Sequence, residues 1–117
     1  MPIYQPLNPG IWTPLELLNG WTNFGDPVAP VGFCVDALNT VYLRGLAVGG
    51  GATDATICVL PVEARPLYRR VFPVVTEIPS YGNNFGRVDV LADGSVQWIV
   101  GGNSYISLDG IVFKVGS

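Results

Sequence analysis

Residues 40–48 read TVYLRGLAV, and this stretch decides the fold class. In an extended strand alternate side chains point to opposite faces, so residues 41, 43, 45 and 47 share one face and the residues between them share the other. Both faces are apolar apart from Arg44. A strand that is apolar on both sides lies within a sandwich or faces a partner subunit, and the lone arginine favours the second setting. The candidate interface residues are therefore Tyr42, Arg44 and Leu46.

Short strands separated by turns surround this stretch. Residues 31–35 and 40–48 form a predicted hairpin around Asp36-Ala37-Leu38-Asn39, in which Asp and Asn favour the turn. With ten prolines and fifteen glycines, no helix longer than about two turns is expected. Seven or eight strands predict an all-β fold, a small antiparallel β-sandwich of the jelly-roll type. The other strands are expected at 56–60, 70–78, 87–91, 95–100 and about 107–115. A hairpin with its turn at 92–94 explains Asp89 and Asp93 better than a calcium loop does.

The first ten residues, MPIYQPLNPG, contain three prolines and no hydrophobic period. Proline restricts the backbone and removes an amide donor, which predicts an extended arm over residues 1–14 ahead of a single sandwich domain over 15–117. Such an arm needs a neighbouring surface. The start lacks the pattern of a signal peptide and no long apolar run follows, so assembly in a cytoplasm without membrane insertion is expected. The candidate docking residues are Pro2, Ile3, Tyr4, Pro6, Leu7 and Pro9.

The composition is 49% hydrophobic and 13% charged, whereas soluble domains carry about 25% charged residues. So few charges leave apolar surface uncovered, which predicts an obligate oligomer. A net charge of −3 with a single lysine argues against nucleic-acid binding. The arginines Arg65, Arg69, Arg70 and Arg87 lie close in the sequence. They either form an anion-binding patch or, as we favour, pair with carboxylates at rims and interfaces.

The chain has no histidine, which removes the usual nucleophile–base pairs and the commonest metal ligand. Cys34 and Cys58 each lie in an apolar run and are interpreted as small buried hydrophobes, with a disulfide left open. The glycines at 49–51 lack the GK[ST] of a phosphate loop and are assigned to a plain loop. We therefore expect no enzyme activity, no metal and no cofactor.

Aromatic residues offer the remaining candidates for binding. Trp21 and Trp98 are expected to anchor a core or an interface, because aromatic side chains fill such sites efficiently. Residues 80–86, SYGNNFG, form a polar loop, and ligand contacts concentrate on loops. The candidate ligand loop consists of Tyr81, Asn83, Asn84 and Phe85.

Five segments, in order, carry a family resemblance: LLNGWTNFG (17–25), VYLRGLAVGG (41–50), TICVLP (56–61) with Arg65-Pro66 after it, VDVLADGSVQWI (88–99) and SYISLDGIVFKV (104–115). Together they resemble the trimeric jelly-roll domain of tailed-bacteriophage virion surface proteins. The resemblance covers residues 15–115. Its most specific motifs are NGW (19–21) and SLDGI (107–111). This sequence departs from the tail-fibre setting because a Pro-rich arm, not a long shaft, precedes the domain.

The resemblance implies a homotrimer on the virion surface, assembled in the bacterial host cytoplasm. We expect first a capsid decoration (cement) protein whose arm docks on the major capsid protein or another virion protein and stabilises the head. The alternative is a tail-fibre or tail-tip receptor-binding domain, in which residues 49–54 and 81–85 contact a host-cell glycan. A lectin-like domain unrelated to virions is the third hypothesis, which a monomeric mass would favour.

Overall fold

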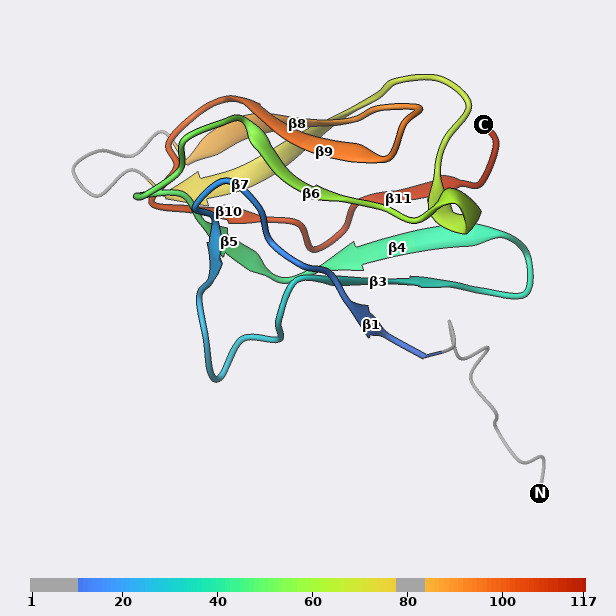
Figure 1. Cartoon of the computed structure of the whole chain (residues 1–117), viewed down its shortest axis with the longest axis horizontal. Coiled ribbons are helices and arrows are strands. Elements are labelled where there is room, and N and C mark those ends of the chain that lie inside the picture. The colour runs from blue at the N-terminus through green and yellow to red at the C-terminus, as the bar shows by residue number, and fades with distance from the viewer. Residues whose placement is uncertain (1–10, 78–83) are drawn as a thin grey trace.

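The computed structural model describes residues 11–77 and 84–117, which form an all-β sandwich of two antiparallel sheets. One sheet has the strand order β1-β3-β4-β11 and the other the order β2-β5-β10-β7-β8-β9-β6. Figure 1 shows β3 and β4 in the lower layer and β8 and β9 in the upper layer. The strands are β1 Thr13–Pro14, β2 Thr22–Asn23, β3 Gly32–Val35, β4 Thr40–Arg44, β5 Leu46–Val48, β6 Thr56–Val59, β7 Arg70–Glu77, β8 Phe85–Val90, β9 Ser95–Val100, β10 Tyr105–Ser107 and β11 Val112–Lys114.

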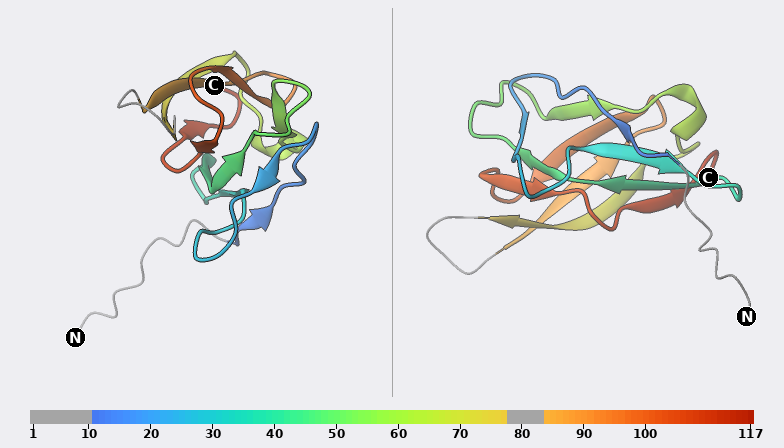
Figure 2. Two further views of the ribbon diagram at one scale, coloured as in Figure 1. Left: turned by 90° about the vertical axis from the view of Figure 1, so that its left-hand side faces the viewer. Right: turned by 90° about the horizontal axis from the view of Figure 1, so that it is seen from below.

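The hairpin β3–β4 forms as the sequence predicts. Its turn is fastened by Asp36, whose Oδ1 accepts hydrogen bonds from the backbone N–H groups of Leu38 and Thr40 at 2.8 and 2.9 Å. The alternation expected over residues 40–48 is confirmed, because residues 41, 43, 45 and 47 are buried and the residues between them are half-buried. In the right-hand view of Figure 2, β3 and β4 cross β7 and β8 obliquely, with the apolar core between the two layers.

Gly45 divides the expected strand 40–48 into β4 and β5, which belong to different sheets. Its φ of +111° lies in a region that residues other than glycine rarely adopt. A Cβ at this position would lie 2.6 Å from the Cα of Val31 and 2.7 Å from its N. The chain therefore turns from one layer into the other at a point where only glycine fits.

A second segment changes sheet beside Gly45. The prediction of a single strand at about 107–115 is wrong, because residues 108–111 separate β10, in the seven-stranded sheet, from β11, in the four-stranded sheet. Leu108 N–H donates to the carbonyl of Gly45 at 2.8 Å, and Gly45 N–H donates to Oδ1 of Asp109 at 2.8 Å. The SLDGI segment thus supplies the partner of the Gly45 corner, a role that its composition alone did not indicate.

Most other strands match the expectation to within one or two residues, and residue 78 lies outside the described ranges. The described residues contain eleven short strands, more than the seven or eight predicted. The β-sandwich is confirmed, while the jelly-roll type stays a prediction. Thr13 and Pro14, assigned to the arm from the sequence, pair with β3 as strand β1. The only helical turn of the described part is a 3-10 helix at Val62–Ala64.

Trp21 and both cysteines are buried. The rings of Trp21 and Trp98 pack edge to face with centroids 6.2 Å apart, and the Trp21 indole N–H donates to the carbonyl of Asp54 at 2.9 Å. Cys34 and Cys58 carry free thiols, and burial raises the pKa of Cys58 to about 12. The interpretation of both cysteines as small buried hydrophobes is confirmed. None of the described residues forms a helix long and apolar enough to cross a membrane.

Candidate functional site

The outward side of β6, β7, β8 and β9 carries exposed apolar side chains around one ion-pair network. Along β7 the exposed residues alternate with residues that face the core, so Val71, Pro73 and Val75 point outward. The strand register places Asp89, Arg87 and Phe85 of β8 directly opposite these three. We call this outward side the arginine face. It consists of Thr56, Val59, Arg69, Val71, Pro73, Val75, Phe85, Arg87, Asp89, Gln97 and Val100.

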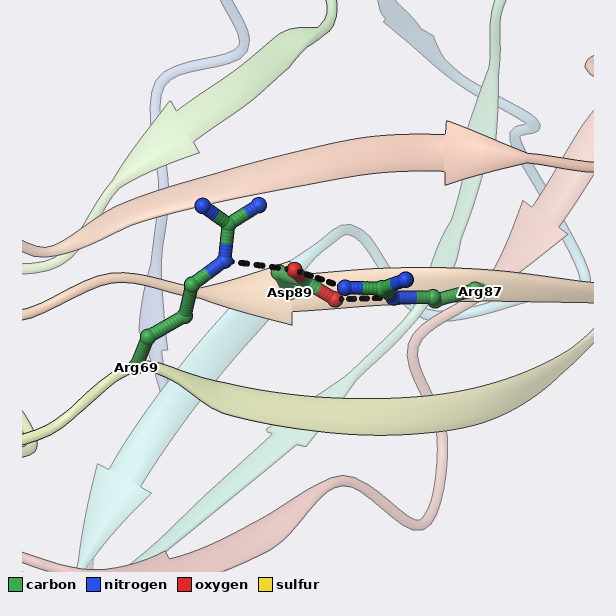
Figure 3. A network of polar contacts seen from close by, with 3 residues as sticks. All are labelled: Arg69, Arg87 and Asp89. Atoms are coloured by element: carbon green, nitrogen blue, oxygen red, sulfur yellow. Dashed lines mark hydrogen bonds and ion pairs between the residues drawn. The ribbon is translucent and has the colours of Figure 1, made fainter.

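Asp89 lies at the centre of the arginine face, yet its side chain is 0% exposed. Arg69 Nε donates to Oδ2 of Asp89 at 2.6 Å, and Arg87 donates from Nε to Oδ1 and from Nη2 to Oδ2, both at 2.8 Å. Figure 3 shows the carboxylate held between the two guanidinium groups. The two arginine side chains are 51% and 43% exposed. The network therefore buries its negative charge and presents its positive charges to the surface.

The strand pattern explains why these three residues meet. Arg87 and Asp89 are two positions apart on β8 and so point to the same face. Arg69 directly precedes β7, whose Val71 lies opposite Asp89, which brings the Arg69 side chain over the carboxylate. Burial by itself raises the pKa of Asp89, but hydrogen bonds and charge from Arg87 and Arg69 outweigh burial and lower it below its ordinary value. Asp89 is consequently ionised at neutral pH.

A polar row continues from the network across the sheet. Asp89 lies opposite Gln97 of β9, which in turn lies opposite Thr56 of β6. The Gln97 amide donates to the Thr56 hydroxyl at 3.2 Å. Because apolar residues flank this row, the arginine face combines a polar centre with an apolar border. Binding sites for small ligands commonly pair a few polar groups with apolar walls.

The candidate ligand loop is only partly described, since Tyr81 and Asn83 lie outside the described residues. Asn84 is exposed, and its carbonyl accepts a hydrogen bond from the Thr76 N–H at 2.8 Å. Phe85 is 71% exposed at the start of β8, and it lies opposite Val75. The arginine face thus includes the one aromatic residue of the candidate loop that the structure describes.

The predicted interface residues separate between the two sheets. Tyr42 and Arg44 lie on β4, on the outward side of the four-stranded sheet, whereas Leu46 lies on β5 in the other sheet. The Arg44 guanidinium lies 4.3 Å from the centre of the Trp12 ring, a cation–π contact. The Tyr42 hydroxyl donates to Asp36 at 3.0 Å, and this hydrogen bond raises the pKa of Tyr42. Tyr42 and Arg44 therefore remain interface candidates together, without Leu46.

The four clustered arginines have different partners. Arg69 and Arg87 share a carboxylate, as the favoured interpretation predicted, whereas Arg65 donates to the Leu60 carbonyl at 2.8 Å and Arg70 to the Ser117 hydroxyl at 2.7 Å. Of the four, only Arg69 and Arg87 share a partner.

Asp89 lies within β8, inside the strand expected at 87–91, and Asp93 belongs to the turn, where it accepts the Ser95 N–H at 2.9 Å. The i, i+2 spacing of Arg87 and Asp89 on one strand face is the signal that sequence reasoning missed. Nothing in the sequence pointed to Arg69 as the second partner.

The candidate docking arm, Pro2 to Pro9, lies outside the described residues. Within residues 11–77 and 84–117, no group of three or more acidic or cysteine side chains comes together as metal ligands.

The fold is similar to that of a solved phage protein, the receptor binding protein (gp15) of Listeria phage PSA. The two structures superpose with a TM-score of 0.75 at 16% sequence identity, over 92% of this chain and 66% of that chain. No protein-family model matches the chain, and no curated protein sequence matches it either. At this identity the likeness shows the fold. The chain thus has the fold of a phage receptor-binding protein, in agreement with the expected resemblance to phage virion surface proteins.

Proposed function

We propose that this protein is a structural component of a tailed-phage virion and that its sandwich binds the host-cell surface as a receptor-binding domain. The similarity to a phage receptor binding protein over 92% of the chain carries this proposal. It favours receptor binding over capsid decoration, which depends on arm residues outside the described ranges. The arginine face offers the binding surface, with an exposed aromatic ring at Phe85 and a polar centre at the Asp89 network.

We expect Phe85→Ala to weaken binding of the fluorescently labelled protein to cells of the propagating bacterial strain by about 10-fold. An aromatic pair contributes about 0.5 to 1.5 kcal/mol beyond the area that it buries, and about 1.4 kcal/mol corresponds to a tenfold change in affinity. The exposed ring has little structural role to lose. Leu38→Ala is the matched control, because Leu38 is a similarly exposed apolar residue (63%) in the β3–β4 turn, on the other sheet. Binding is measured by flow cytometry over a concentration series.

Immunogold microscopy of intact particles gives the independent test. Gold confined to the tail tip is expected. Gold spread over the head, together with wild-type protein that does not bind host cells, would replace this proposal with capsid decoration.

The receptor-binding form is proposed to be a homotrimer. Only 13% of the residues are charged, which supports association of several copies of the chain. The outward side of the four-stranded sheet offers a contact surface around Tyr42 and Arg44. Sedimentation equilibrium is expected to give three times the chain mass of 12.5 kDa. Val112→Glu is expected to shift this mass toward the monomer, because Val112 lies exposed beside Tyr42 and a charge there opposes burial. A monomeric wild type would contradict the trimer and favour the lectin-like hypothesis.

A further inference from the structure

The guanidinium groups of the arginine face have donors left over after they bind Asp89. An arginine side chain has five N–H donors. Arg69 donates one of them to Asp89 and Arg87 donates two. Among the described residues no other acceptor binds either group, and both side chains are about half exposed. Several donors from two arginines are therefore available to a molecule at the surface.

The network also carries a net positive charge. Two guanidinium groups surround one carboxylate, and Asp89 is ionised because its pKa is lowered. The carboxylate lies beneath the surface, so an approaching anion meets the positive groups first. The buried carboxylate also fixes the Nε side of both guanidinium planes, which reduces the entropy lost when a ligand binds.

We infer that Arg69 and Arg87 together bind an oxyanion, a carboxylate or a phosphate group, on a saccharide of the host-cell surface. Guanidinium groups match the geometry of carboxylates and phosphates through paired N–H···O bonds. The neighbouring Gln97 and Thr56 offer partners for sugar hydroxyls, and Phe85 offers an apolar face for the sugar ring. This inference rests on the proposed receptor-binding function and adds the chemical class of the ligand.

The test compares three probes that differ in the oxyanion: sodium glucuronate, glucose 6-phosphate and glucose. Their binding to the full chain is followed by the side-chain Nε–H signals of arginine in two-dimensional NMR. We expect the Arg69 and Arg87 signals to shift with glucuronate or glucose 6-phosphate and to stay in place with glucose. The shifts should diminish as salt is added, because exposed charges are screened. Arg65, whose Nε is bound to a backbone carbonyl, is the internal control.

Two variants keep the positive charge but remove the planar group. Arg69→Lys and Arg87→Lys are expected to lower the affinity for the anionic probes at least 10-fold, whereas Arg65→Lys, at an arginine that donates to the Leu60 carbonyl, leaves it unchanged. Thermal melts of each variant separate lost binding from lost folding. Signals that shift equally with glucose, or with none of the probes, overturn the inference. A lower assembly mass for both lysine variants also overturns it, because these arginines would then join copies of the chain.

The inference and the proposed function fail in different ways. If Phe85→Ala weakens binding to host cells about 10-fold and Arg69→Lys leaves it unchanged, receptor binding stands and the oxyanion site falls. If the anionic probes bind but the protein does not bind host cells, the oxyanion site stands and receptor binding falls.

Discussion

Replacing Gly45 with alanine is expected to lower the free energy of unfolding by about 3 to 5 kcal/mol, the sum of backbone strain and steric overlap. The strain arises because φ is +111°, and the overlap because a Cβ would lie 2.6 Å from the backbone of Val31. The two nearest atoms, the Cα and N of Val31, cannot move aside at low energetic cost, because they belong to the backbone of a core residue that precedes β3. Urea denaturation followed by tryptophan fluorescence measures the loss.

Gly110→Ala separates the two contributions to this loss. Gly110 also has a positive φ, +88°, but a Cβ there would meet nothing within 4 Å. Its replacement should therefore cost only the strain, about 1 kcal/mol. If both variants lose the same free energy of unfolding, the close packing of Val31 against Gly45 does not contribute to stability.

Asp89→Asn is expected to lower the free energy of unfolding by about 2 to 3 kcal/mol, the range for charge-assisted hydrogen bonds made by a buried carboxylate. The loss is smaller than for a fully buried ion pair, because both arginines are about half exposed and regain solvation. Glu63→Gln is the control, since Glu63 is an exposed acid at the 3-10 helix and makes no ion pair with the described residues.

The Asp89 network also makes stability depend on pH. Because the pKa of Asp89 is lowered in the folded protein, its contribution is complete above the pKa of an unfolded aspartate, about 4, and disappears as the pH falls through the lower folded value. Wild-type protein should lose more stability than Asp89→Asn between pH 5 and pH 2, both values being measured by denaturation. Identical pH profiles for the two proteins would mean that Arg69 and Arg87 do not stabilise the ionised form.

Local sequence patterns were sufficient to predict the all-β class and the positions of most strands. The alternation over residues 40–48 and the turn residues at 36–39 depend on neighbours in the sequence, and both appear in the structure as expected. The break at Gly45 was not predicted, because a glycine within an alternating strand fits a continuous strand equally well. What decides the break is the approach of Val31, which is distant in the sequence.

The candidate site was less predictable for the same reason. Arg87 and Asp89 share a strand face by their spacing, but Arg69 joins them only through the register between β7 and β8. The four arginines looked alike in the sequence, and tertiary partners divided them into two that surround a carboxylate and two that bind a backbone carbonyl or a serine. Phe85 was predicted as a ligand-loop residue because it lies in a polar, glycine-containing segment; the structure places it at the start of β8, with its side chain exposed, and its contact with a ligand stays a prediction.

The corner formed by Gly45 and residues 108–111 affects how the protein unfolds. Two neighbouring segments, β4–β5 and β10–β11, each pass between the sheets at this corner. They stay hydrogen-bonded to each other through the crossing. The two sheets cannot separate unless the hydrogen bonds between these segments break. We therefore expect the sandwich to unfold as one cooperative unit, in which amides of both sheets exchange with solvent through the same global opening.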